Sequence, residues 1–195
     1  MPFYKFKDWT PVVDPSSYIH PTAVIIGNVL IGKKVYIGPG AVLRADWGKI
    51  LIEDGCNVQE NCVIHMFPGT TVHLHENAHV GHGAIIHGAI LKKNCLIGMN
   101  SVVMDDAVIG ENSITGALSF VNSKKIIPKN SLAVGNPAKV IRELTKEQIE
   151  WKTEGTKYYQ KLPLDNEKYL TECQPLKDVE TDRPEQISDY KTWDK

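Results

Sequence analysis

Three histidines are spaced so that they could share a metal ion. His65 directly follows Ile64, His87 directly follows Ile86, and His82 precedes His87 in the pattern His-x4-His. If Ile64 and Ile86 lie on adjacent strands, the two imidazoles are about 4.8 Å apart. Two stacked imidazoles with a third nearby can bind a divalent cation, and three His ligands with one open position form the usual catalytic zinc site. Such a site activates water for attack on an electrophilic carbon, provided that the fold stacks these residues.

A six-residue repeat predicts that stacking. Large apolar residues recur at six-residue intervals, and a small residue lies four positions after most of them. A period of six is typical of a parallel β-helix, in which three hexads make one triangular coil. We therefore predict an all-β solenoid over residues 21–136, preceded by a strand and turn at 1–20. The large residues of the repeat are Ile31, Ile37, Leu43, Ile52, Val58, Ile64, Leu74, Val80, Ile86, Leu91, Ile97, Val103, Ile109, Thr115, Val121, Ile127 and Ala133.

Counting hexads places the candidate residues in two columns. His65 lies one coil above His87, and Arg44 lies one coil above His65. His82 and Gln59 belong to the neighbouring column, where His82 is close to a corner. From there His82 could reach the His65–His87 pair of an adjacent subunit. The alternative is that all these residues are surface polar groups, because the position after each large residue of the repeat is exposed.

Two irregular intervals interrupt the repeat. Nine residues separate Leu43 from Ile52, and ten separate Ile64 from Leu74. We predict loops there, at 44–48 and at 65–70. Loops on a rigid scaffold often carry function, and both lie beside the histidine column.

The chain after the solenoid has a different character. Gly135-Asn136-Pro137 ends the repeat, since Pro and Gly cannot continue a paired strand. Within 137–163 we predict a helix that Thr145 caps, with Gln148 completing a capping box, and that ends near Lys161. The acidic, Pro-containing segment 164–195 is expected to be extended or disordered.

Composition excludes several classes of partner. The net charge is −1 over 195 residues, which argues against nucleic acid or an anionic membrane surface as the main partner. No apolar run reaches the length of a transmembrane helix. Cys56, Cys62 and Cys95 occupy small-residue positions of the repeat, so we expect buried, reduced thiols and a cytoplasmic protein.

The motifs around these residues resemble those of a known family. They are Leu43-Arg44-Ala45-Asp46, Asn57-Val58-Gln59-Glu60, His82-Gly83-Ala84-Ile85-Ile86-His87-Gly88 and Ile97-Gly98-Met99-Asn100-Ser101. From about residue 17 to 161 the chain resembles the γ-class carbonic anhydrases, which are left-handed parallel β-helices of hexapeptide repeats with a C-terminal α-helix. Within that family it looks most like the branch encoded with phenylacetate- and carnitine-metabolism genes, on Gly116–Val121 and Trp151–Thr156.

The resemblance implies a homotrimer with metal sites between subunits. His65 and His87 of one chain and His82 of the next would bind Zn²⁺, although Fe²⁺ or Co²⁺ suits the same ligands. A zinc-activated water would convert CO₂ to bicarbonate, with Gln59 as its hydrogen-bond partner. The remaining implied site residues are Arg44 and Asp46, an ion pair whose arginine can hold an anion, and Asn57 and Asn100, which line or support the pocket.

The chain departs from the family where protons would be transferred. Trp47 replaces an acidic residue, and the loop after His65 is short and carries no acid. Another group must then remove the proton from the zinc-bound water, and His73, His75 and Glu60 are the candidates. Three functions stay open: CO₂ hydration, a reaction of acyl-CoA (thioester hydrolysis, or acyl transfer as in related hexapeptide enzymes), and a non-enzymatic trimeric accessory protein.

Overall fold

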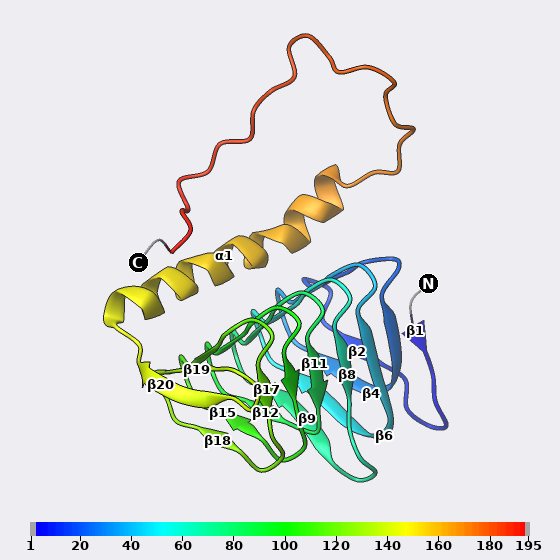
Figure 1. Ribbon diagram of the computed structural model, residues 1–195. Coiled ribbons are helices and arrows are strands. Elements are labelled where there is room, and N and C mark those ends of the chain that lie inside the picture. The colour runs from blue at the N-terminus through cyan, green and yellow to red at the C-terminus, as the bar shows by residue number, and fades with distance from the viewer. Residues whose placement is uncertain (1–2, 194–195) are drawn as a thin grey trace.

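The protein is a three-faced parallel β-helix with one long helix lying along it (Figure 1). The computed structural model describes residues 3–193, so the first two residues of the predicted N-terminal segment lie outside it. The predicted left-handed β-helix is confirmed. Within the described residues no helix is long and apolar enough to cross a bilayer.

Each face of the solenoid is a parallel ladder of short strands, named here after one member. The β8 face contains β1 (Phe3–Tyr4), the first halves of β4 (Val24–Ile31) and β6 (Val42–Ile52), β8 (Val63–His65), β11 (Ile85–His87), β14 (Val102–Val103) and β17 (Phe120–Val121). The β9 face contains β2 (Val12–Val13), the second halves of β4 and β6, β9 (Thr71–Leu74), β12 (Ile90–Leu91), β15 (Val108–Ile109) and β18 (Ile126–Ile127). The β10 face contains β3 (Tyr18–Ile19), β5 (Tyr36–Ile37), β7 (Asn57–Val58), β10 (His79–Val80), β13 (Leu96–Ile97), β16 (Ile114–Thr115), β19 (Ser131–Val134) and the antiparallel β20 (Lys139–Glu143).

The strand register confirms the hexad count. Ile64 pairs with Ile86, and His65 pairs with His87 on the next strand. Leu43 pairs with Ile64, which places Arg44 at the level above His65. The large residues of the repeat point inward and are almost fully buried, because alternate side chains of a strand point to opposite faces. The repeat therefore places residues about one coil apart in contact.

Only the second predicted loop is a loop. Residues 66–70 connect β8 to β9 outside any strand, whereas 44–48 lie inside the eleven-residue strand β6. The prediction at 44–48 is wrong because β4, one coil above, is also long and pairs with both ends of β6. The extra residues are absorbed as an irregularity opposite Gly27 and Val29.

An asparagine ladder lines the corner between the β9 and β10 faces. Asn94 donates from Nδ2 to Oδ1 of Asn112 at 2.9 Å, and Asn112 donates in the same way to Asn130 at 3.0 Å. All three have a φ near +55° to +57°, the left-handed region that asparagine tolerates well. This ladder is where the C-terminal helix attaches.

The helix α1 (Lys146–Tyr169) begins at the predicted capping box of Thr145 and Gln148. It continues through Pro163, so the predicted end near Lys161 is wrong. A proline removes one hydrogen bond but keeps a helical φ, and Pro163 is among the buried residues of the helix. Residues 170–193 contain no helix or strand; they run outward as an extended chain and return to α1 (Figure 1).

Candidate metal centre

The β8 face places two imidazole rings in contact at its outer surface. Nδ1 of His65 lies 3.3 Å from Nε2 of His87, and the ring centroids are 5.3 Å apart. The planes of the two rings are tilted by 57° relative to each other. His65 is mostly buried, with 9% of its side chain exposed, while His87 is more open.

Each ring has a carboxylate on its other nitrogen. Nε2 of His65 donates to Oδ1 of Asp46 at 3.0 Å, and Nδ1 of His87 donates to Oδ1 of Asp105 at 2.7 Å. The guanidinium of Arg44 in turn donates to Oδ2 of Asp46 at 2.6 Å. The facing nitrogens, Nδ1 of His65 and Nε2 of His87, therefore both carry lone pairs when the rings are neutral.

The protonation of this group favours neutral imidazole beside ionised carboxylate. Burial lowers the pKa of His65, against the hydrogen bond to Asp46, which raises it. Burial opposes ionisation of Asp46, but the hydrogen bonds from Arg44 and His65 prevail and lower its pKa. Neutral histidine is the form that binds metals.

The spacing of the two nitrogens fits a tetrahedral ion. Two ligands about 2.0–2.1 Å from Zn²⁺ at the tetrahedral angle are about 3.3–3.4 Å apart, and the structure has 3.3 Å. Two unprotonated nitrogens that face each other at this distance repel unless a cation lies between them. Zinc-binding histidines usually donate the N–H of their other ring nitrogen to a carboxylate, a carbonyl or water, which fixes the ring and its tautomer.

His82 lies at the corner between the β10 and β8 faces. Its Nδ1 donates to Oε2 of Glu60 at 2.5 Å, and 49% of its side chain is exposed. Its Nε2 is therefore the nitrogen left for a metal. In the described part of a single chain, His82 does not join His65 and His87 in any group that could hold one ion.

Gln59 and Asn57 group with His82 and not with the His65–His87 pair. Oε1 of Gln59 accepts the backbone N–H of His82 at 3.2 Å, and its Nε2 donates to Oδ1 of Asn57 at 3.0 Å. Nε2 of Gln59 also contacts Nε2 of His79. Asn57 and Gln59 are buried, and burial lowers the pKa of His79 well below its usual value. Asn57 Nδ2 and His79 Nδ1 have no hydrogen-bond partner among the described residues.

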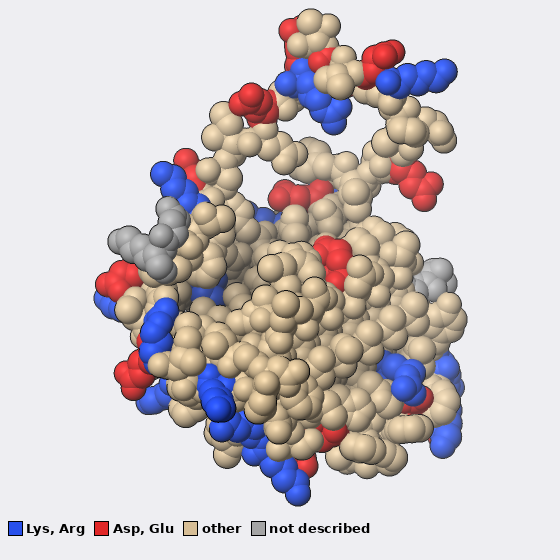
Figure 2. Space-filling model, in the orientation of Figure 1, with Lys and Arg blue, Asp and Glu red and all other residues tan. Residues whose placement is uncertain are grey.

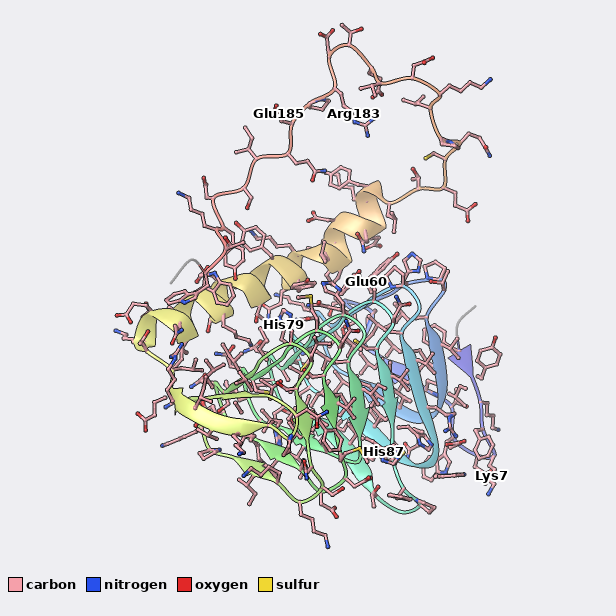
Figure 3. All side chains as sticks on the ribbon, viewed as in Figure 1. Lys7, Glu60, His79, His87, Arg183 and Glu185 are labelled. Atoms are coloured by element: carbon pink, nitrogen blue, oxygen red, sulfur yellow. The ribbon has the colours of Figure 1, made fainter. Side chains whose placement is uncertain are left out.

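Asn100 lies one coil below His82. Its backbone N–H donates to the carbonyl of His82 at 2.8 Å, and its φ is +54°. It therefore shapes the turn that carries His82. Figure 3 shows Glu60 and His79 on the side that faces α1, and His87 on another side of the solenoid.

Aromatic rings flank the histidine pair. The ring of Trp47 lies 5.1 Å from that of His65, and the ring of Phe67 lies 5.2 Å from that of His87. Both side chains are more than half exposed, and Arg44 lies 5.7 Å from the centre of the Trp47 ring. Trp47 thus stands beside the site, as its position in the sequence predicted.

A groove of about 950 Å³ lies between α1 and the β10 face. Gln59, Glu60, His79 and His82 contribute to one part of it, and the rest of its lining is mostly apolar. The helix side consists mainly of Trp151, Gly155, Tyr158, Tyr159 and Leu162, with Tyr190 from the returning C-terminal segment. The groove begins beside His82 and could hold a ligand much larger than CO₂.

Two side chains that contact the candidate site residues, Asp105 and His79, were not predicted from the sequence. Asp105 lies 18 residues after His87, about one coil, so the repeat length could have indicated it. His79 pairs with Asn57 across β7 and β10, which the same count places together. Nothing in the repeat indicates the contacts made by the helix, such as the edge-on contact between the rings of Tyr159 and His79, whose centroids are 4.9 Å apart.

The fold and the site define a hexapeptide-repeat β-helix protein with a carboxylate-supported histidine centre. The family described as "Bacterial transferase hexapeptide (six repeats)" matches residues 10–45 and 88–123. Carnitine operon protein CaiE of Salmonella agona is 46% identical over 184 residues, which cover 94% of this chain and 93% of that protein. The chain belongs to the hexapeptide-repeat family and, within it, to the group of the carnitine operon proteins CaiE.

Two solved structures support this assignment. A putative acetyltransferase from Bacillus cereus superposes with a TM-score of 0.81 at 38% identity, covering 83% of this chain and 94% of that one. A hexapeptide transferase family protein from Anaplasma phagocytophilum gives a TM-score of 0.81 at 35% identity, covering 86% and 98%. The match to CaiE confirms the carnitine-operon part of the predicted resemblance.

Proposed function

We propose that this protein is a trimeric, metal-dependent enzyme that hydrates CO₂ reversibly to bicarbonate. Zn²⁺ would bind between His65 and His87 of one subunit and His82 of the next; Fe²⁺ or Co²⁺ could replace it. One observation carries this proposal: all three histidines have a carboxylate on one ring nitrogen and leave the other free. Three such histidines are the ligand set of a catalytic site with one open position.

The chain's own residues hold the ligands and shape the site. Asp46 and Asp105 fix the two stacked rings, and Glu60 fixes His82. A bound Zn²⁺ supplies the chemistry, because it lowers the pKa of a coordinated water to about 7. Gln59, which hydrogen-bonds the backbone of His82, would enter the site together with that residue.

The outer surface of the β8 face supports the oligomer. Val63, Ile85, Val102 and Phe120 follow one another along this ladder and are partly or largely exposed. Figure 2 shows that the face turned to the viewer is largely uncharged, with most Lys, Arg, Asp and Glu around its rim. A stripe of this kind beside His65 and His87 suits a second copy of the chain, whose corner would supply His82.

The walls of the site suit a small, apolar substrate and an anionic product. Trp47 and Phe67 flank the histidines and offer apolar surface to CO₂. Arg44 is held by Asp46 at the edge of the site, with 39% of its side chain exposed, and would attract bicarbonate.

Glu60 is our candidate for proton exchange with solvent. It bonds His82 and Tyr36, and it is partly exposed. Burial opposes its ionisation, but its hydrogen bonds lower its pKa, so it is a carboxylate at neutral pH. His73 and His75, the other two candidates, bond instead to Glu53 on the β9 face. We also place the protein in the cytoplasm, since Cys56, Cys62 and Cys95 are buried free thiols.

Hydrolysis of an acyl-CoA thioester is the second candidate. The observation that favours it is the groove of about 950 Å³ beside His82 and Glu60, which is far larger than CO₂ requires. Its apolar walls suit an acyl or aryl group whose carbonyl carbon would reach the metal-activated water.

Metal analysis with two activity assays on one preparation tests these proposals. We expect about one zinc per chain, a trimer by light scattering, and faster CO₂ hydration in stopped flow. His82→Ala should remove the metal and leave the trimer, while His20→Ala, which alters a histidine bonded to Thr22, should change neither. A His82→Ala protein that keeps this zinc would contradict the inter-subunit site.

The assays also separate the remaining functions. Metal-dependent release of free CoA from acyl- or aryl-CoA, without CO₂ hydration, would replace the first candidate with the second. Inactivity of the metal-loaded trimer in both assays would favour the accessory role.

A further inference from the structure

We propose a second metal site on the β9 face, formed by Glu53, His73 and His75, that takes a divalent transition-metal ion. Nε2 of His73 lies 2.7 Å from Oε1 of Glu53, and Nδ1 of His75 lies 3.2 Å from the same oxygen. One ligand atom from each of the three residues lies within 4.8 Å of the others. This is the one such group of three among the described residues of the chain.

The solenoid itself brings these side chains together. His73 and His75 are two residues apart at the end of β9, so both point outward on one face. Ile52 pairs with Leu74, which places Glu53 one coil above His75. The two imidazoles stack with centroids 3.8 Å apart, and about three-quarters of each side chain is buried. The ligands are therefore held by strand register and not by a flexible loop.

The spacing of the three ligand atoms fits a bound ion. Ligands about 2.0–2.1 Å from an ion are about 2.7–3.4 Å apart when the angles between them are about 80–110°. The distances from Oε1 of Glu53 to Nε2 of His73 and to Nδ1 of His75 both fall inside this range. An ion could thus replace the protons now shared with Glu53 after a rotation of the two rings, with no shift of the backbone.

The charges around the site also favour a cation. The free oxygen of Glu53, Oε2, accepts the backbone N–H of Glu76 at 3.0 Å, which fixes the carboxylate. The carboxylate thereby keeps its other oxygen, Oε1, within 3.2 Å of both imidazoles.

Lys92 competes for the same site. Its Nζ lies 3.4 Å from Nε2 of His75, so it directs the proton of that ring toward Glu53. Binding of a metal at Nδ1 requires Lys92 to move away, and a long, partly exposed side chain can do so. Replacement of Lys92 should therefore strengthen metal binding, which is a result that a purely structural hydrogen-bond network would not give.

Two imidazole nitrogens and one carboxylate oxygen suit Zn²⁺, Co²⁺, Ni²⁺ or Cu²⁺ better than Mg²⁺ or Ca²⁺. The residues belong to a different face from His65 and His87, so this site does not depend on assembly between subunits. It also does not depend on the function proposed above.

The test uses the full-length protein with His82→Ala and His87→Ala. These substitutions disable the site proposed above between His65 and His87 of one subunit and His82 of the next, called the first site here. We expect this variant to bind about one Ni²⁺ per chain by titration calorimetry, and the Cu²⁺ form to show two nitrogen ligands in its electron paramagnetic resonance spectrum. Adding His73→Ala or Glu53→Gln should weaken Ni²⁺ binding by at least about 10- to 100-fold. That is the loss usually seen when a group that only hydrogen-bonds a metal ligand is removed. Adding Lys92→Gln should tighten it roughly tenfold, because a positive charge beside the ion is removed.

Adding His20→Ala to the same variant is the matched control and should leave binding unchanged, and circular dichroism reports whether each variant folds. Absence of Ni²⁺ binding, or binding that Glu53→Gln and His73→Ala both leave intact in folded protein, would overturn the proposal. If the first site does not exist, the protein without substitutions binds a single ion that His73→Ala removes and His82→Ala does not. Failure of one site is thereby distinguished from failure of the other.

Discussion

The buried ammonium of Lys152 makes the stability of the protein depend on pH in a way that can be measured. This side chain is 2% exposed, although it belongs to a helix on the surface of the solenoid. Its Nζ donates to the carbonyl of Asn77 at 2.9 Å and to Oδ1 of Asn94 at 2.7 Å, and so fixes α1 to the asparagine ladder. Burial lowers its pKa to about 8, while Cys95 and Cys56 raise it.

The size of the effect follows from this pKa. A free lysine has a pKa of 10.5, so the folded state disfavours the charged form by about 3 kcal/mol. Because the folded pKa is the lower one, this penalty is fully present below about pH 8 and is relieved as the pH rises toward 10.5. Between about pH 7 and about pH 9.5 the contribution of Lys152 to stability should grow by about 2 kcal/mol.

The buried thiols change the stability of the protein with pH in the direction opposite to Lys152. Burial raises the pKa of Cys62 to about 11 and that of Cys95 to about 12. The folded chain then keeps protons that the unfolded chain loses near pH 9, so these groups reduce stability as the pH rises above that value. A comparison of two proteins that share these cysteines cancels their contribution.

The assay therefore compares the free energy of unfolding of the unmodified protein with that of Lys152→Met. The free energy of unfolding is measured at both pH values by guanidinium titration, with far-UV circular dichroism as the signal. We expect the unmodified protein to gain about 2 kcal/mol relative to Lys152→Met between about pH 7 and about pH 9.5. Lys157→Met, which removes an exposed lysine of the same helix, should show no such change. A difference that stays constant within about 0.5 kcal/mol would refute the reasoning.

Two further predictions concern the metal centre and the C-terminal segment. Asp105→Ala leaves Nδ1 of His87 without its acceptor and should weaken zinc binding by about 10- to 100-fold in a chelator competition; an unchanged affinity would show that this carboxylate does not support the ligand. Gly155→Ala should release the returning segment from α1, because a Cβ there would lie 2.5 Å from the hydroxyl oxygen of Tyr190. Limited proteolysis should then cleave residues 170–193 faster, and an equal rate would contradict the packing.

The repeat determines what could be predicted from the sequence. The stacking of His65 on His87 follows from counting hexads, because each coil is closed by backbone hydrogen bonds that fix the register. The position of His82 near a corner follows from the same count. The β-helix thus converts sequence separation into contact, and this part of the site was accessible without a structure.

The contacts of α1 could not be predicted in that way. Lys152 reaches Asn94, which is 58 residues away, and Gln160 reaches Asn77, which is 83 residues away. No periodicity relates the helix to the solenoid, so neither contact has a signal in the sequence. The helix also continues through Pro163, where a local rule predicts an end, because the local preference is weaker than the packing of a long helix along the solenoid.

The repeat also places the carboxylates that hydrogen-bond the histidines. The separations are 19 residues from Asp46 to His65, 18 from His87 to Asp105, 22 from Glu60 to His82 and 20 from Glu53 to His73. Each is about one coil, so each of these four histidines has its carboxylate on the adjacent coil. At His65, His82 and His87 this carboxylate fixes the tautomer and leaves the lone pair of the other ring nitrogen for a ligand. Both candidate metal sites therefore combine a histidine with a carboxylate from the adjacent coil, which orients the ring in the first site and is itself a ligand in the second.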